Sequence, residues 1–453
     1  MFDWAYKKRL KDDLEIWAAN GWVTSEGASA ILRDQERDDG RSRLPMALAG
    51  IGMVCVALAV FAFIAANWDA IPKFVKLAGI AALVAGSHWL AAVAAVKDRK
   101  GISDLATGFA TLVFVGGMAL VGQIFHLPSD WAGGAFLVVV GGLAAAWLTG
   151  SKTALVVACV AAVIWQVTRS DIGAPDPLQD LIGLVFLVAV AAHAVVYPAR
   201  LSRWAAISLL WVAYGRWFGD TADLLGGGDD AVSAMALAGA GGLAAILLQL
   251  DAVADLFVKW SSGRPERRHG HWLMTRSLQD AGLLVLCALI VLCLVLEPEF
   301  HGNHYSLGLM AIPGLVPLGL AVFLCGTGLL LSFKSAKSMA LFAVAGLSLL
   351  TLLVPLATAN VPIRAAMCLA ALTALCALGT WYNNRFWMLC AYLGLTAVAL
   401  WLLQVTVGSL LGQSLFFLVA GLLLLAMAIW LARVFRKKQT LPESPENARE
   451  TRS

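Results

Sequence analysis

Two short polar stretches of the sequence carry residues that could do chemistry at the ends of neighbouring apolar segments. Residues 67–69 read Asn-Trp-Asp, and residues 122–131 contain a glutamine, a histidine and an aspartate before a tryptophan. His126 could act as a general acid or base if Asp69 or Asp130 lay within hydrogen-bond reach of its ring. The candidate cluster formed by the two stretches is Asn67, Trp68, Asp69, Gln123, His126, Asp130 and Trp131.

The same residues also suit the ends of membrane-spanning helices. Asp130 or Ser129 can cap the amino terminus of the helix that follows, and Pro72 suits the first turn of another. The sequence contains no Gly-x-Ser-x-Gly, His-Glu-x-x-His or Walker-type motif to supply a nucleophile, zinc or a nucleotide. It therefore favours a capping and anchoring role and leans against an enzyme. A small-molecule or ion site and catalysis remain the alternatives.

A second polar group lies between residues 297 and 304. Its two carboxylates and two imidazoles are ligand types for zinc and other divalent ions. Pro298 and Gly302 interrupt any helix there and favour a solvated loop, so we predict neither a metal site nor a cofactor. The residues of the metal-binding alternative are Glu297, Glu299, His301 and His304.

The composition predicts what must position these residues. Of the 453 residues, 60% are hydrophobic and only 14% are charged, and the mean hydropathy is +0.79. A soluble domain is about half apolar and about a quarter charged. The values exclude an ordinary soluble enzyme, a disordered chain and a disulfide-rich secreted domain. They predict an all-α, polytopic helical integral membrane protein that does not bind nucleic acid.

The eight cysteines lie in apolar runs without a Cys-x-x-Cys pair, so they are expected to be buried thiols.

The apolar runs predict about fourteen spans of the hydrocarbon core, which needs about 20 helical residues. The fifth and seventh are short and weak, so twelve spans is the alternative. The predicted spans are residues 44–67, 73–96, 104–125, 131–149, 153–169, 178–197, 201–218, 231–250, 279–296, 306–333, 337–356, 361–380, 386–405 and 412–432.

The distribution of basic residues predicts the orientation of these spans. With fourteen spans, 28 of the 33 lysines and arginines lie on one side, together with both termini. The positive-inside rule makes that side cytoplasmic. If the source is bacterial, the expected location is the inner membrane, because the outer membrane takes β-barrels. Arginines between residues 264 and 268 and the tail at 433–453 would then face anionic lipid headgroups, although this charge also serves as a plain topology signal.

Residues 1–43 differ from the rest because they are rich in both acidic and basic side chains. Their apolar residues recur at helical spacing, Asn20-Gly21 breaks the pattern, and Thr24 or Ser25 can cap a second helix to about Arg37. The pattern predicts a cytoplasmic two-helix module. Because two short helices bury little surface alone, this module is expected to lie on the membrane, pack on its own protein, bind a cytoplasmic partner or self-associate.

The interior of the predicted bundle, residues 44–432, is uncharged. No Asp, Glu or Lys falls in the middle of a span, which argues against an ion-coupled pump. Pro313 and Pro317 should kink the tenth span. Several glycines should allow close approach of helices; these are Gly116, Gly117, Gly122, Gly134, Gly141, Gly239 and Gly242.

The polar stretches resemble the prokaryotic membrane-protein family known as domain of unknown function 2157. The resemblance rests on residues 67–69, on the Gly-Gln-x-x-His-Leu element at residues 122–127, and on the segment from Trp17 to Thr24. It covers roughly residues 10–150. The family implies no activity, substrate or catalytic residue.

Three functions remain open on the sequence alone. Span number, proline kinks and an uncharged interior favour transport or permeation of a small uncharged or amphiphilic molecule. The first alternative is an interaction or assembly protein that recruits a partner through residues 1–43. The second is a membrane-embedded enzyme that uses His126 with Asp69 or Asp130.

Overall fold

The computed structural model describes most of the chain as a series of helices. It covers residues 13–15, 17–39, 43–66, 72–126, 128–170, 176–222, 229–260, 269–295, 312–332, 336–357 and 360–406. The helices are α2 (Ser25–Asp39), α3 (Arg43–Ala66), α4 (Lys73–Val96), α5 (Lys100–Ile124), α6 (Trp131–Thr149), α7 (Lys152–Thr168), α8 (Pro177–Val196), α9 (Arg200–Ala222), α10 (Asp229–Trp260), α11 (His269–Val295), α12 (Ile312–Leu331), α13 (Ala336–Ala357), α14 (Val361–Trp381) and α15 (Arg385–Thr406).

The prediction of an all-α polytopic membrane protein is confirmed. Within the described residues, ten helices are long and apolar enough to cross a membrane, and α7 is a shorter apolar helix. Each of the first thirteen predicted spans corresponds to one helix, from α3 to α15. The count of fourteen stays a prediction, because α3, α7 and α9 are not among those ten helices and the last predicted span, 412–432, lies outside the described residues.

Two helices are longer than their apolar runs predicted. The span predicted for 231–250 continues as α10 to Trp260, and the span predicted for 279–296 begins ten residues earlier, as α11 at His269. Charged and polar side chains near a helix end do not break the backbone hydrogen bonds, so the helix outlasts the hydrophobic run. At 1.5 Å per residue, the 32 residues of α10 span about 48 Å, more than the roughly 30 Å of hydrocarbon.

The start of α2 follows the capping rules. Gly21 has a φ of +72°, and the Thr24 hydroxyl accepts a hydrogen bond from the Gly27 N–H at 3.1 Å, which confirms the predicted break and cap. Trp22 in the connecting turn is 73% exposed. Recruitment of a partner by residues 1–43 stays a prediction.

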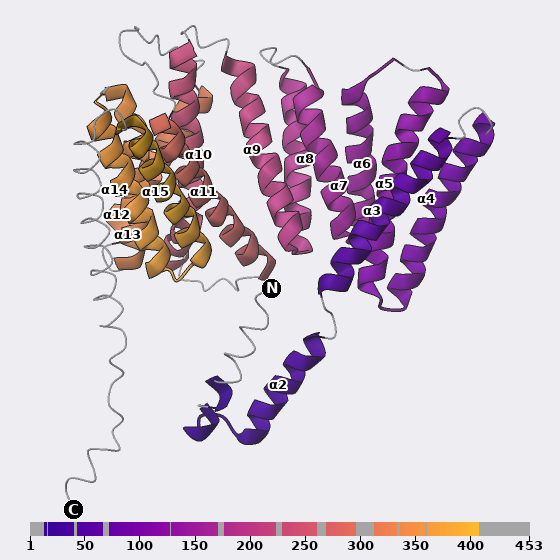
Figure 1. The fold of residues 1–453 in the computed structure, drawn as a ribbon, viewed down its shortest axis with the longest axis horizontal. Helices are drawn as coiled ribbons and strands as arrows, with labels where there is room; N and C mark the ends of the chain where they lie inside the picture. Colours follow the sequence, from indigo (N-terminus) through magenta and orange to yellow (C-terminus); the bar gives the residue numbers. More distant parts are fainter. Residues whose placement is uncertain are drawn as a thin grey trace, which may run out of the picture. The chain divides into compact units, whose positions relative to one another are not determined.

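The chain forms two compact units, and the first contains residues 1–171 and 176–216. Helix α5 packs against α3, α4, α6 and α7, and α8 packs against α6 and α7 (Figure 1). Asp104 at the start of α5 joins α5 to α7, because its Oδ1 accepts from the Lys152 N–H at 2.7 Å, the Thr153 N–H at 3.1 Å and the Ser151 hydroxyl at 2.7 Å. A carboxylate at the amino terminus of a helix satisfies its first N–H groups and complements its dipole.

The second unit contains residues 172–175 and 217–453. Helix α10 contacts α11, α12 and α13, and α11 also contacts α13, α14 and α15 (Figure 1). At Gly242 an added Cβ would lie 2.5 Å from backbone atoms of Pro317 and Leu318, and at Gly282 it would lie 2.6 Å from the Ala244 carbonyl oxygen. The backbones of α10, α11 and α12 therefore approach as closely as small residues permit.

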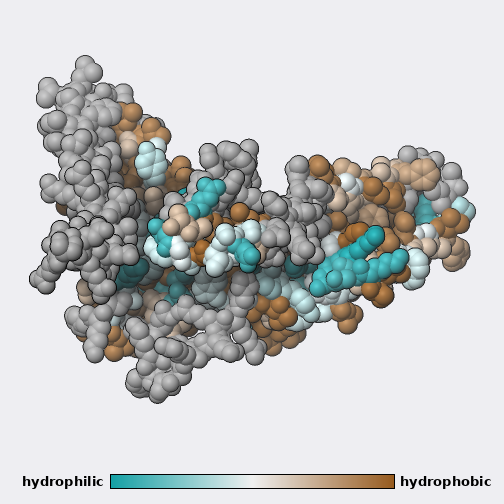
Figure 2. Space-filling view, turned by 90° about the horizontal axis from the view of Figure 1, so that it is seen from below, coloured by the Kyte–Doolittle hydropathy of each residue, from teal (hydrophilic) through white to brown (hydrophobic). Residues whose placement is uncertain are grey.

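The surface has the character expected of a membrane protein. Many large apolar side chains are exposed, among them Phe74 on α4, Leu184 on α8 and Phe323 on α12. Figure 2 shows brown hydrophobic side chains along the visible flanks of the described helices and teal hydrophilic side chains where helix ends face the viewer. Lipid tails would cover the apolar flanks.

Candidate functional site

The members of the predicted polar cluster that the structure describes lie at the ends of α5 and α6. Asp130 caps α6, because its Oδ1 accepts from the Gly133 N–H at 2.7 Å, which confirms the capping prediction. His126 has a φ of +53° directly after the end of α5, the left-handed conformation in which helices often terminate. Gln123 is exposed in the last turn of α5, and Trp131 is 76% exposed at the start of α6.

The other half of the cluster, Asn67, Trp68 and Asp69, lies outside the described residues. The pairing of His126 with Asp69 is therefore untested and stays a prediction. Pro72 holds the N-cap position of α4, with φ −60° and ψ 146°, so the prediction that it lies within the first turn was wrong by one position. The extended ψ explains the shift, because the helix begins only at the residue that follows.

The residues of the metal-binding alternative also lie outside the described residues, since residues 296–311 are not covered. Among the residues that the structure describes, no group of three or more His, Cys, Asp or Glu side chains could hold a metal ion.

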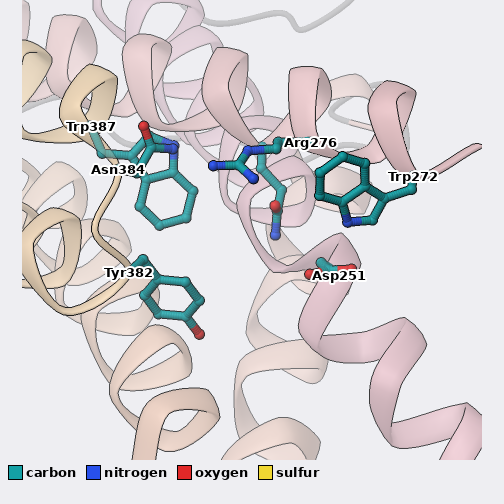
Figure 3. Close-up of a pocket in the computed structure, with 7 residues that line it drawn as sticks. Asp251, Trp272, Arg276, Tyr382, Asn384 and Trp387 are labelled. Carbon is teal, nitrogen blue, oxygen red and sulfur yellow. The ribbon is translucent and has the colours of Figure 1, made fainter. Parts of the chain in front are cut away.

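A pocket lies in the second unit, where the end of α10, the start of α11 and the turn between α14 and α15 meet. It encloses about 110 Å³, and Figure 3 shows how its side chains converge. The lining residues are Asp251, Trp272, Arg276, Gln279, Tyr382, Asn384 and Trp387.

Arg276 is the cationic group of the pocket. Its guanidinium carbon lies 5.5 Å from the centre of the Trp272 ring, within the range of a cation–π contact. The two residues are four positions apart and so share one face of α11. Arg276 is exposed, and in Figure 3 it lies between the rings of Trp272 and Trp387. A guanidinium so placed can donate paired hydrogen bonds to a phosphate or carboxylate.

The opposite wall of the pocket is the turn between α14 and α15, which is held by Asp280 of α11. The Asp280 Oδ1 accepts from the Trp387 indole N–H at 2.7 Å and from the Asn384 amide at 3.0 Å. Trp387 is only 2% exposed, so it is a buried residue of the pocket wall. The Tyr382 hydroxyl donates to the Lys337 carbonyl at 3.2 Å. The aromatic wall is thus fixed in place before any ligand binds.

The floor of the pocket joins α11 to α10. The Gln279 amide donates to the Leu248 carbonyl at 3.3 Å, one turn before Asp251 on α10. One turn further along α11, the close approach of Gly282 to Ala244 keeps α10 and α11 together. Asp251 therefore faces the same space as Arg276, and Figure 3 shows it on α10, below Trp272 in that view.

Sequence reasoning missed Asp251 and Arg276, although a signal for them was present. Residues 272, 276 and 279 are spaced by four and three, the spacing of one helical face. That pattern has meaning only if α11 begins near residue 269, whereas the hydrophobic run predicted a start at 279.

The amino-terminal part of the chain can be compared with known proteins. Residues 15–155 match the family described as "Predicted membrane protein (DUF2157)". This match confirms the resemblance over almost the range expected and supports a membrane protein, while the family description carries no activity. No curated protein and no solved structure matches the chain. The pocket lies outside the matched residues.

Proposed function

We propose that this membrane protein binds an amphiphilic molecule, such as a phospholipid, and assists its movement in or across the bilayer. The observation that carries the proposal is the exposed Arg276, held against Trp272 in a small pocket at the helix ends. Pockets that enclose a whole drug-sized ligand hold about 300–1,000 Å³. A space of about 110 Å³ suits a charged head whose apolar remainder stays outside the pocket.

The depth of the pocket supports an amphiphile over a soluble substrate. Asp251 follows the predicted span 231–250 by one residue, Arg276 precedes the span at 279, and Tyr382 follows the span that ends at 380. All three positions fall on the side predicted to be cytoplasmic, where lipid headgroups meet water. A molecule bound there can keep its tails against the exposed apolar flanks of the helices.

The absence of acidic and lysine side chains near the centres of the predicted spans supports movement of an amphiphile over ion-coupled transport. Ionisable groups at mid-membrane depth usually mark ion pathways, and the predicted spans contain no Asp, Glu or Lys near their centres. Pro317 lies inside α12, where it removes a backbone hydrogen bond and favours a bend. Helix α12 packs against α10 at Gly242, and α10 also carries Asp251 of the pocket, so a bend in α12 could open a path along α10.

Replacing Arg276 with alanine should weaken phospholipid binding about tenfold, because charge-assisted bonds to the phosphate are lost. Native mass spectrometry of delipidated, detergent-solubilised protein, titrated with phosphatidylglycerol and phosphatidylethanolamine, measures this directly. Transbilayer movement of a fluorescent phospholipid in vesicles containing the protein should slow in the same variant.

Arg385→Ala is the matched control, since Arg385 is an exposed arginine at the start of α15, on the same predicted side, and does not line the pocket. It should bind both lipids as the unaltered protein does. Equal binding by the protein and Arg276→Ala would refute a headgroup site at this pocket.

The predicted cytoplasmic position of the pocket can be tested separately. In a background without the eight native cysteines, we expect Ser129→Cys to react with a membrane-impermeant thiol reagent in intact cells and Arg385→Cys to react only after lysis. Both positions are exposed, and they lie on opposite sides of the predicted topology. Reaction of Arg385→Cys in intact cells would show that the pocket faces outward and would contradict the orientation given by the basic residues.

A further inference from the structure

The pocket carries groups of opposite charge from two different helices. Arg276 comes from α11 and Asp251 from α10, and both line the same space of about 110 Å³. Resting on the proposed function, we infer that the head of the bound amphiphile is zwitterionic, with its phosphate on Arg276 and its ammonium group between Asp251 and the aromatic wall.

The aromatic wall suits a cation. The rings of Tyr382 and Trp387 lie 5.4 Å apart at an interplanar angle of 42°, and both line the pocket. Ring faces attract ammonium groups, and the attraction grows when water is partly excluded. Arg276 already stacks on Trp272, which leaves Tyr382 as the more accessible ring for a second positive charge, with the buried Trp387 packed against it.

Asp251 is the carboxylate that can receive this charge. The other nearby acid, Asp280, directs one oxygen to both the Trp387 indole and the Asn384 amide, so its role is to position the wall. A carboxylate has about four acceptor sites, so Asp251 can bind an ammonium group while keeping other contacts.

A purely anionic head fits the pocket less well. Its negative charge would share a small, partly enclosed space with Asp251, and like charges at short range repel. In a zwitterionic head the phosphate and the ammonium group are joined by a short carbon bridge, which matches two opposite charges on the walls of one small pocket. The pair Arg276 and Asp251 therefore selects against lipids such as phosphatidylglycerol.

The test compares Asp251→Asn with the unaltered protein by native mass spectrometry, using phosphatidylethanolamine and phosphatidylglycerol. We expect the unaltered protein to prefer phosphatidylethanolamine about fivefold to tenfold. Asp251→Asn should abolish this preference by weakening phosphatidylethanolamine binding, while phosphatidylglycerol binding stays equal or improves. Asp98→Asn is the control, because Asp98 is an exposed carboxylate in the turn before α5, outside the pocket.

The outcomes separate this inference from the function on which it rests. If Arg276→Ala reduces binding of both lipids but phosphatidylglycerol binds as well as phosphatidylethanolamine, the zwitterionic assignment is wrong and the headgroup site stands. If neither lipid depends on Arg276, both fail. Soluble glycerophosphoethanolamine is added as a competitor. If it displaces the lipid at concentrations similar to those of the lipid, the zwitterionic assignment stands, but the ligand is a free, water-soluble molecule and not a membrane lipid.

Discussion

Replacing Gly242 with alanine should destabilise the second unit by about 3 kcal/mol, the upper part of the range for overpacking. The added methyl carbon would lie 2.5 Å from the Pro317 carbonyl carbon and the Leu318 nitrogen. These are backbone atoms, which cannot rotate aside as a side chain can. Helices α10 and α12 would have to separate, although α10 contacts three neighbouring helices.

Thermal denaturation of the detergent-solubilised protein measures this effect. The fraction that remains folded after each heating step is determined by size-exclusion chromatography. A loss of this size lowers the melting temperature of a unit of about 240 residues by roughly 6–12 °C. Gly319→Ala is the control on α12, since no atom lies within 4 Å of its added Cβ, and it should leave the melting temperature unchanged or slightly raised. Equal melting of both variants would mean that α10 and α12 are not packed as described.

Replacing Asp104 with alanine should destabilise the first unit by about 2–4 kcal/mol. Two N–H groups at the start of α7, together with the Ser151 hydroxyl, lose a charged acceptor in a partly buried place. Asp104→Asn should cost about half as much, because an amide oxygen can still accept while the negative charge at the helix amino terminus is gone.

Hydrogen exchange locates this effect in the chain. The amides of Lys152 and Thr153 should lose protection in Asp104→Ala, while α10 and α11 keep theirs. Asp98→Asn is again the matched control: Asp98 pairs with Lys100 at 3.6 Å, with both side chains more than four-fifths exposed, and such pairs add little to stability. Unchanged exchange at α7 in Asp104→Ala would rule out the capping role.

The family match and the pocket concern different parts of the molecule. The match covers residues 15–155, within the first unit, whereas the pocket is built entirely from the second. Lipid binding at Arg276 would therefore add a function that the family description does not carry, and variants such as Asp104→Ala and Arg276→Ala address the two parts separately.

The sequence by itself determined the class of protein and the places where helices occur. Long apolar runs can satisfy their backbone hydrogen bonds in lipid only as helices or closed barrels, so each run from residue 44 to 405 could be assigned to one helix. Local rules also predicted the caps at Thr24 and Asp130, because a cap depends on residues only three positions apart. The glycines were predicted less well: Gly242 lies at a close contact, whereas Gly122 and Gly134 have no atom within 4 Å of an added Cβ.

Only the tertiary structure decided which polar side chains meet. Asp251, Arg276 and Tyr382 are separated by up to 131 positions in the chain and come together because α10 and α11 approach at Gly282 and because Asp280 fixes the turn after α14. Hydrophobic periodicity reports which segments enter the membrane, but it does not report which helices become neighbours or how far a helix extends past its apolar run. The pocket is formed at those extended ends, where the pairing of helices determines which charges lie together.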